Sequence, residues 1–200
     1  MYSTAIVPLE ILCYLCFQMR DYDIRNLLKE FHLLKYKNDG KSKVVEEFTI
    51  TSAGARIDLA VINGRLHGFE IKSASDTLSR LPTQMKAYAK VFDYVSVVTE
   101  GKHYESLCNA LPEWVGIYVC TNNKIRRIRK EALNTERSSF NIAKLLWKDE
   151  LIDVLKTAQI PYSRKERSWQ LCELIEKHMS PDQISKHVRD KLKKRTDWKT

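Results

Sequence analysis

The chain has 200 residues, 44% of them hydrophobic, and its 34 Lys and Arg against 25 Asp and Glu give a formal charge of +9. This length predicts one domain, or one domain with a small appendage, with enough apolar residues for an ordinary core. No stretch is apolar for long enough to span a membrane as a helix, so we expect no membrane partner.

The first residues and the cysteines favour a cytoplasmic protein. Residues 1–18 are apolar but lack a basic start and a clear cleavage site, so we expect a peripheral helix or dispensable extension rather than a signal peptide. The five cysteines are an odd number, and the Cys-x-x-Cys spacing of Cys13 and Cys16 has no second Cys or His pair nearby. We therefore expect neither a zinc site nor a redox role there, and a reducing compartment.

The basic excess is confined to the last 77 residues. Residues 1–123 carry 14 basic and 14 acidic side chains, whereas residues 124–200 carry 20 and 11. Such an asymmetry is typical of a protein with an anionic partner, above all nucleic acid. The alternative is a solvated basic face that only aids solubility.

The first half of the chain predicts a helix and then a three-stranded meander. Residues 21–34 have apolar side chains at helical spacing, and residues 35–43 predict a polar, basic loop. Strands are predicted at residues 44–50, 56–62 and 66–72. The pair Asn63-Gly64, which strongly favours a hairpin, joins the last two strands.

Helices and strands alternate beyond the meander. A helix is predicted from Ser75-Asp76-Thr77 onward, then a strand at 93–99, a helix at 103–110 and a strand at 115–120. This order predicts an α/β fold with a mixed central sheet flanked by helices. Residues 123–140 are polar and basic and predict a connector.

The remaining residues, 141–200, predict a basic helical extension. Helices are expected at 141–156, 169–178 and 182–195. The segment between the first two contains the basic residues Arg164, Lys165 and Arg167. Two helices with a basic connector are similar to SAP-like or helix-turn-helix DNA-binding units, so these three residues are candidate nucleic-acid ligands. The alternative is an extension that packs on the core and has a solvated basic end.

The candidate site lies on the two strands joined by Asn63-Gly64. Residues two apart in a strand point to the same face, and the hairpin sets Asp58 beside Glu70 and Lys72. A strand Glu-x-Lys is most often a simple ion pair or edge protection. Here the flanking residues are nearly all apolar, and a buried carboxylate is costly unless it is paired or bound to metal. One lysine neutralises only one of the two acids.

These residue types are suited to phosphodiester hydrolysis. Magnesium prefers oxygen ligands and keeps several waters, so Asp58 and Glu70 would hold one ion, with the carbonyl of Ile71 as a third ligand. Manganese is an alternative ion. Lys72 would orient the attacking water or offset charge on the scissile phosphate. Arg56 would share the face of Asp58 and meet an acid or a phosphate, whereas His67 is expected on the opposite face as a bystander.

The order of elements and motifs over residues 20–120 resembles the PD-(D/E)XK nuclease superfamily. Asp58 matches its strand aspartate, although Ile57 replaces the proline of the family's name, and Glu70 with Lys72 matches its Glu-x-Lys. The segment Gln84-Met-Lys-Ala-Tyr88 is similar to the Gln-x-x-x-Tyr motif of the RecB-like branch. The stretch from Asp76 to Leu81 also looks like that of small bacterial and phage-borne proteins of unsettled role.

The resemblance implies a restriction-endonuclease-like core over residues 19–122 and a Mg-dependent deoxyribonuclease. It implies that Gln84 contacts the nucleophile region or the nucleic-acid backbone. For Tyr88, core packing and substrate contact both remain open. The family's upstream glutamate matches Glu46 or Glu47, and alternation cannot decide between them. We expect DNA as the partner, and a homodimer would suit cleavage of both strands.

Overall fold

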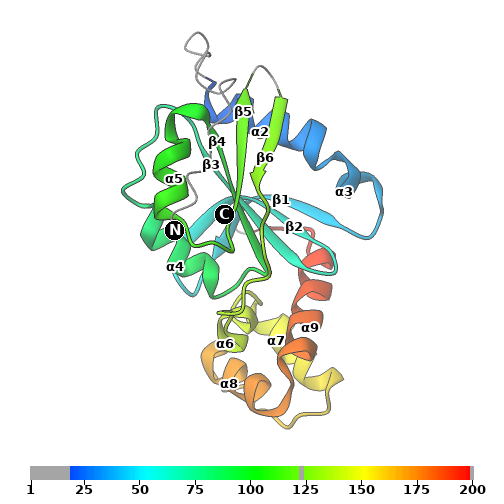
Figure 1. Cartoon of the computed structure of the whole chain (residues 1–200). Coiled ribbons are helices and arrows are strands. Elements are labelled where there is room, and N and C mark those ends of the chain that lie inside the picture. The colour runs from blue at the N-terminus through cyan, green and yellow to red at the C-terminus, as the bar shows by residue number, and fades with distance from the viewer. Residues whose placement is uncertain (1–18, 122–123, 199–200) are drawn as a thin grey trace.

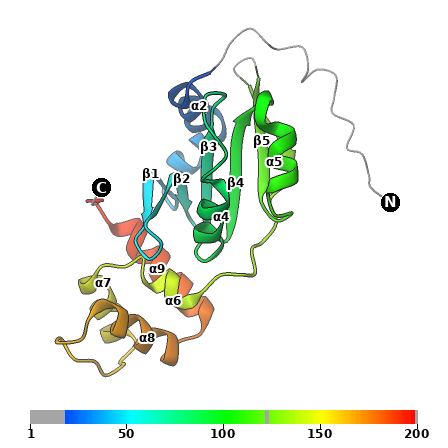
Figure 2. The same ribbon diagram turned by 90° about the vertical axis from the view of Figure 1, so that its left-hand side faces the viewer.

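The computed structural model describes residues 19–121 and 124–198, so the expectations for residues 1–18 lie outside the described residues. A six-stranded mixed sheet with the order β1-β2-β3-β4-β5-β6 forms the centre of the molecule (Figure 1). Helices cover both of its faces, and four C-terminal helices gather at one end of it (Figure 2). The prediction of an α/β protein with a mixed sheet and C-terminal helices is confirmed.

The strands follow the predicted meander and then run parallel. β1, β2 and β3 are antiparallel neighbours, β3, β4 and β5 are parallel, and β6 returns antiparallel to β5. The bounds are Lys43–Ile50 for β1, Ala55–Ile62 for β2, Leu66–Lys72 for β3, Tyr94–Glu100 for β4, Gly116–Thr121 for β5 and Lys124–Arg129 for β6. The first five strands confirm the sequence predictions within about one residue.

Strand β6 corrects the predicted connector over residues 123–140. The sheet has a hydrophobic core on each face, and Ile125 and Ile128 of β6 pack against one core each. The basic side chains of this strand, whose sequence is Lys-Ile-Arg-Arg-Ile-Arg, are exposed or half-buried. A strand at the edge of a sheet often carries charged side chains. The basic composition of this segment therefore fitted an edge strand as well as the predicted connector.

The N-terminal helical segment covers one face of the sheet. It contains α2 (Asp21–Leu27), the π-helical turn η1 (Leu28–His32) and α3 (Leu34–Asn38). Its apolar residues, among them Ile24 and Leu28, pack on the side chains of β2, β3 and β5 that point to this face. The loop expected at 35–43 is helical up to Asn38, because Leu33 is buried in this core and holds the following turn against the sheet.

The opposite face is covered by α4 (Leu81–Ala89) and α5 (Tyr104–Ala110), the latter preceded by the 3-10 turn η2 (Gly101–His103). Helix α4 begins later than predicted. Asp76 accepts hydrogen bonds from the backbone and hydroxyl of Ser73 and so closes a turn instead of capping a helix. Pro82 lies in the first turn of α4, where its missing N–H costs nothing.

The C-terminal part consists of α6 (Ser139–Ala143), α7 (Lys148–Thr157), α8 (Ser168–His178) and α9 (Pro181–Lys194). The helix predicted over 141–156 is broken at residues 144–147, because Trp147 leaves the helix to cap α7, where its backbone N–H donates to Glu150. Residues of all four helices share one hydrophobic core with the sheet, which agrees with the expectation that the extension packs on the core.

Among the residues that the structure describes, no helix has the length and apolar character needed to cross a membrane.

Candidate active site

The ladder between β2 and β3 ends at the level of Asp58. Backbone pairing runs from Ile62 and Leu66 to Leu59 and Phe69, and the next pair in this register is Asp58 with Glu70. At this level a side chain replaces the backbone acceptor of the ladder: the backbone N–H of Ile71 donates a hydrogen bond of 2.7 Å to Asp58 Oδ2. The predicted hairpin is confirmed with a longer turn, because Asn63 and Arg65 bond to each other across Gly64.

Glu70 is the centre of the site, only 3% exposed and surrounded by donors. Its Oε1 lies 2.7 Å from Lys72 Nζ and 2.7 Å from Gln84 Nε2, and its Oε2 lies 2.7 Å from the hydroxyl of Tyr88. Gln84 and Tyr88 are four residues apart on α4 and therefore face the sheet together. The structure thus brings together Glu70, Lys72, Gln84 and Tyr88.

Tyr88 both packs in the core and takes part in the site. Its side chain is fully buried in the core beneath α4, and its hydroxyl lies 2.7 Å from Glu70 Oε2 and 2.7 Å from the carbonyl oxygen of Arg56. Burial, and secondly the charge of Glu70, raise the pKa of Tyr88 well above its usual range. The tyrosine therefore stays protonated, and its one hydroxyl proton is within reach of both Glu70 Oε2 and the Arg56 carbonyl oxygen.

Arg25 on α2 is a site residue that the sequence prediction missed. Its Nη2 lies 2.9 Å from Asp58 Oδ1, its Nη1 lies 2.8 Å from Glu47 Oε1, and its Nε lies 3.3 Å from Asp21 Oδ1. The guanidinium group thus joins the first helix to the two central carboxylates of β1 and β2. The spacing of Asp21 and Arg25 indicated a helical ion pair, but not the contact with Asp58.

Asp58 is harder to ionise than an ordinary aspartate. Burial, followed by the charge of Glu70, raises the pKa of Asp58 to about 7, in spite of the opposing effects of the Ile71 N–H and Arg25. A carboxylate whose pKa is raised by burial and by a neighbouring carboxylate is typical of functional sites that bind a cation.

Glu46 and Glu47 are both held by basic side chains. Glu47 stands opposite Asp58 between the pairs Glu46–Leu59 and Phe48–Ile57, and its φ of 52° is a left-handed conformation that is strained for a residue with a side chain. It pairs with Arg25 and with Arg56 Nε at 2.8 Å. Glu46 pairs with Lys29. Glu47 is therefore the nearer of the two to Asp58 along the sheet.

The donor set fits a hard divalent ion in part. Asp58 and Glu70 offer carboxylate oxygens, and a cation between them would relieve the repulsion that raises the pKa of Asp58. Within residues 19–121 and 124–198, however, no three Asp, Glu, His or Cys side chains form a group that could hold a metal. Two carboxylates with waters completing the shell suit magnesium. The carbonyl of Ile71 and the upstream glutamate stay predictions as ligands.

The remaining predicted residues lie away from the acids or have other partners. His67 is on the opposite face, stacked on Phe69, with its Nε2 2.9 Å from Ser96 Oγ, as expected of a bystander. Arg56 is 61% exposed and pairs with Glu47. Arg164, Lys165 and Arg167 are exposed on the segment between α7 and α8, at the end of the helical part remote from the sheet (Figure 2).

The fold and the site define an α/β protein with a six-stranded mixed sheet and a cluster of Glu70, Lys72, Gln84 and Tyr88 with Asp58 beside it. The family model of Bacteriophage P4 protein cII matches residues 17–199, so the chain belongs to this family. It is 27% identical over 181 residues to Protein cII of Enterobacteria phage P4, across 88% of this chain and 68% of that protein.

Among solved structures, the chain is similar to a protein of unknown function from Silicibacter pomeroyi. The TM-score is 0.41 and the identity 16%, over 67% of this chain and 92% of that chain. Family membership by itself assigns no chemistry to the site.

Proposed function

We propose that this protein is a metal-dependent nuclease that hydrolyses phosphodiester bonds in DNA and has a core of the PD-(D/E)XK type. The observation that carries the proposal is the convergence of Glu70, Lys72 and Gln84 within 3.2 Å of one another, with Asp58 in the next register position. An ordinary strand ion pair needs neither a glutamine bonded to both partners nor a second carboxylate nearby. A site that binds a cation and a phosphate uses a second carboxylate as a ligand of the cation and a polar amide to orient the groups around it.

Each side chain has a task that follows from its contacts. Gln84 and Tyr88 fix the carboxylate of Glu70 in one orientation, and Ile71 N–H fixes that of Asp58. Asp58 and Glu70 would hold the magnesium or manganese ion. When bound, that ion supplies a Lewis acid that lowers the pKa of a water and stabilises charge on the phosphoryl oxygens. Lys72 positions the attacking water and offsets negative charge on the phosphate.

A second candidate function is a nucleic-acid-binding module with a catalytically silent version of this fold. It is favoured by Arg25 and Lys72, which already pair with Asp58 and Glu70, so both acids have a cationic partner within the chain. In this alternative the cluster stabilises the sheet and the basic residues bind the nucleic acid. The two candidates differ in what removal of Asp58 does.

The test compares wild-type protein with Asp58→Asn on linear duplex, circular duplex, single-stranded DNA and RNA, with magnesium, manganese or a chelator. Asp149→Asn is the matched control, because Asp149 is exposed on α7 and makes no contact with the site. We expect cleavage of DNA that needs the metal and falls at least about 100-fold in Asp58→Asn, with no change in Asp149→Asn.

The melting temperatures of both variants are compared with that of the wild-type protein, so that a loss of cleavage is not a loss of folding. Cleavage at the wild-type rate by Asp58→Asn would refute the site assignment. Binding without cleavage under any metal would establish the silent module instead. Hydrolysis of RNA alone would correct the substrate class. Analytical ultracentrifugation with and without DNA tests the expected homodimer.

A further inference from the structure

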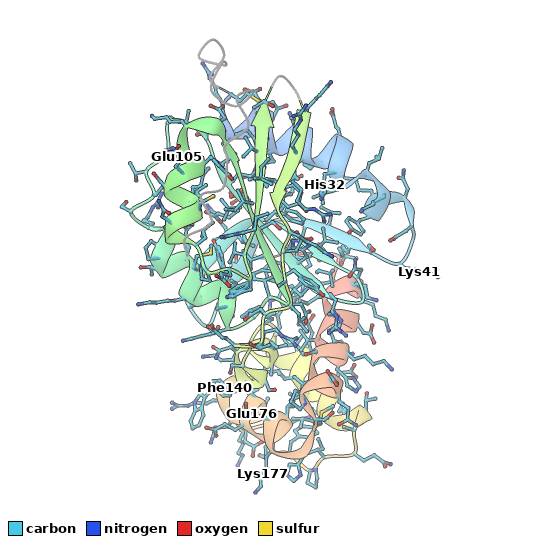
Figure 3. The ribbon with its side chains drawn as sticks, viewed as in Figure 1. His32, Lys41, Glu105, Phe140, Glu176 and Lys177 are labelled. Atoms are coloured by element: carbon cyan, nitrogen blue, oxygen red, sulfur yellow. The ribbon has the colours of Figure 1, made fainter. Side chains whose placement is uncertain are left out.

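A concave pocket of about 530 Å³ lies at the end of β2 and β3 that is opposite to the acids. Its walls are the segment between α3 and β1, the turn at Asn63 and Gly64, and one side of α9. The four basic side chains that line it are Lys41, Lys186, Arg189 and Lys193. In Figure 3, Lys41 lies at this edge of the molecule.

The rotation of α9 directs its basic residues into the pocket. Ile184, Val188 and Leu192 are buried at four-residue intervals against the shared core, which fixes the orientation of the helix. Lys186, Arg189 and Lys193 follow one another at intervals of three and four residues, so they form one stripe beside the buried face. Their shared direction is thus a consequence of the packing of α9.

The two acids of the pocket, Asp39 and Asp190, neutralise only one of these four side chains. Asp190 pairs with Lys193 at 3.4 Å, and Asp39 accepts hydrogen bonds from the backbone and hydroxyl of Ser42. In the part of the chain that the structure describes, the side chains of Lys41, Lys186 and Arg189 have no hydrogen bond or ion pair. The pocket therefore keeps an excess of positive charge.

The neighbourhood of Arg189 adds to this charge. Burial, and further the nearby Arg65 and Arg137, lower the pKa of Arg189, while Asp93 and Asp190 oppose that effect. Asp93 is itself buried and already pairs with Arg137, and with Arg65 at 3.6 Å. Asp93 is thus already paired with two other arginines, so an additional anion beside Arg189 would be favourable.

We propose that this pocket binds a phosphate group of the nucleic-acid backbone and thereby positions the nucleic acid on the protein. Arginine and lysine side chains that converge from separate elements suit a phosphate oxyanion, and such contacts fix position without reading sequence. The turn at Asn63 is five residues from Asp58, roughly 17 Å along a strand, so the pocket holds a phosphate other than the one at the acids. The inference rests on the proposed nucleic-acid partner, but not on cleavage.

The test uses the full chain with Lys186→Gln and Arg189→Gln combined, and a fluorescent DNA duplex in the presence of chelator. The matched control combines Lys156→Gln and Lys177→Gln, which remove the same charge from exposed positions of α7 and α8. Lys177 lies at the far end of the helical part (Figure 3). Affinity is measured by anisotropy over a series of salt concentrations, and melting temperatures verify the fold.

We expect the pocket variant to bind about tenfold more weakly and to lose about 1 from the slope of log affinity against log salt, and the control pair to change neither by a comparable amount. Arg189→Lys, which keeps the charge, should recover most of the affinity. Equal losses in the pocket variant and the control pair would overturn the proposal, because they would report only net charge.

A further arm separates the two sources of phosphate. If inorganic phosphate raises the melting temperature of wild type but not of the pocket variant, while duplex affinity is equal in both, the ligand is free phosphate and the nucleic-acid assignment is overturned. The same experiments distinguish failure of the nuclease proposal from failure of the pocket proposal. If binding depends on the pocket and no DNA is cleaved, the pocket proposal is retained and the nuclease proposal is refuted. Cleavage with unchanged binding by the pocket variant refutes this inference and retains the enzyme.

Discussion

The two ends of β2 and β3 carry charges of opposite sign in opposite environments. At one end Asp58 and Glu70 are largely buried, and each already contacts a cationic side chain, Arg25 or Lys72. At the other end Lys186 and its basic neighbours line an open pocket and mostly lack partners. Buried charges must be paired to be tolerated, whereas exposed ones are stabilised by water. Substitutions should therefore affect stability at the acid end and binding at the basic end.

The largest expected effect on stability is at Lys72. Replacement by methionine leaves Glu70 buried without its cation, and we expect a loss of about 3–5 kcal/mol in the free energy of unfolding. Lys41→Met in the pocket removes the same charge from an exposed side chain and should cost less than about 0.5 kcal/mol. Urea unfolding of both variants measures the difference. Equal losses would contradict the contrast between the two ends.

The next effect is expected at Tyr88. Tyr88→Phe keeps the ring in the core but removes the donor that lies 2.7 Å from Glu70 Oε2 and from the carbonyl of Arg56. The hydroxyl has one proton and serves one of these two acceptors, and leaving that buried acceptor without its donor should cost about 2 kcal/mol in the free energy of unfolding. Tyr22→Phe, at a side chain that is 69% exposed, is the control and should be neutral. A neutral Tyr88→Phe would mean that Glu70 does not need this hydrogen bond.

Two glycines of the same hairpin have different surroundings. A Cβ on Gly68 would lie 2.5 Å from Ile57 Cδ1 and 3.2 Å from the ring of Phe92, so Gly68→Ala should cost about 1–2 kcal/mol through overpacking. A Cβ on Gly64, in the turn beside the basic pocket, would meet nothing within 4 Å, so Gly64→Ala should be close to neutral. Thermal unfolding distinguishes the two, and a costly Gly64→Ala would show that the turn is tighter than its surroundings indicate.

The smallest effect concerns pH. Because the pKa of Asp58 is raised from 3.8 to about 7 in the folded, metal-free protein, the folded state favours the protonated carboxyl. The stability that this group contributes is therefore present below about pH 4 and is lost as pH rises toward 7. The side chain is 20% exposed, which reduces the effect to on the order of 1 kcal/mol.

Melting temperatures in chelator between pH 4 and 8 test this expectation. Asp58→Asn should flatten the profile, whereas Asp182→Asn, at an exposed position in the first turn of α9, should leave it unchanged. A profile with the same slope in Asp58→Asn would assign the pH dependence to other groups.

Local pattern was sufficient for much of the site. The alternation of β2 and β3, with Asn63 and Gly64 between them, predicted that Asp58, Glu70 and Lys72 meet, and the four-residue spacing of Gln84 and Tyr88 predicted a shared helix face. These relations depend on neighbours in sequence or on one hairpin register. The contacts around Glu70 bear out the shared positions of Lys72, Gln84 and Tyr88, and Asp58 lies one position beyond the last pair of the β2–β3 ladder.

Other features depended on contacts between distant parts of the chain. Arg25 reaches Asp58 across 33 residues of sequence, and no local pattern specifies that contact. The strand β6 has the composition of a basic connector and is recognised only by its pairing with β5. Residues 144–147 end a helix that periodicity would continue, because Trp147 and Glu150 cap α7 where it joins the shared core.

Local pattern therefore predicted the first five strands, most of the helices, the hairpin and the set of side chains around Glu70. The physical reason is that backbone periodicity decides which side chains of one element face the same way. The pairing of the charges, in contrast, follows from contacts between distant parts of the chain. The tertiary structure assigned Arg25 to Asp58 and Glu47, and it assembled the basic pocket from α9 and two loops, because the partner of a charge is chosen by packing and burial rather than by position in the chain.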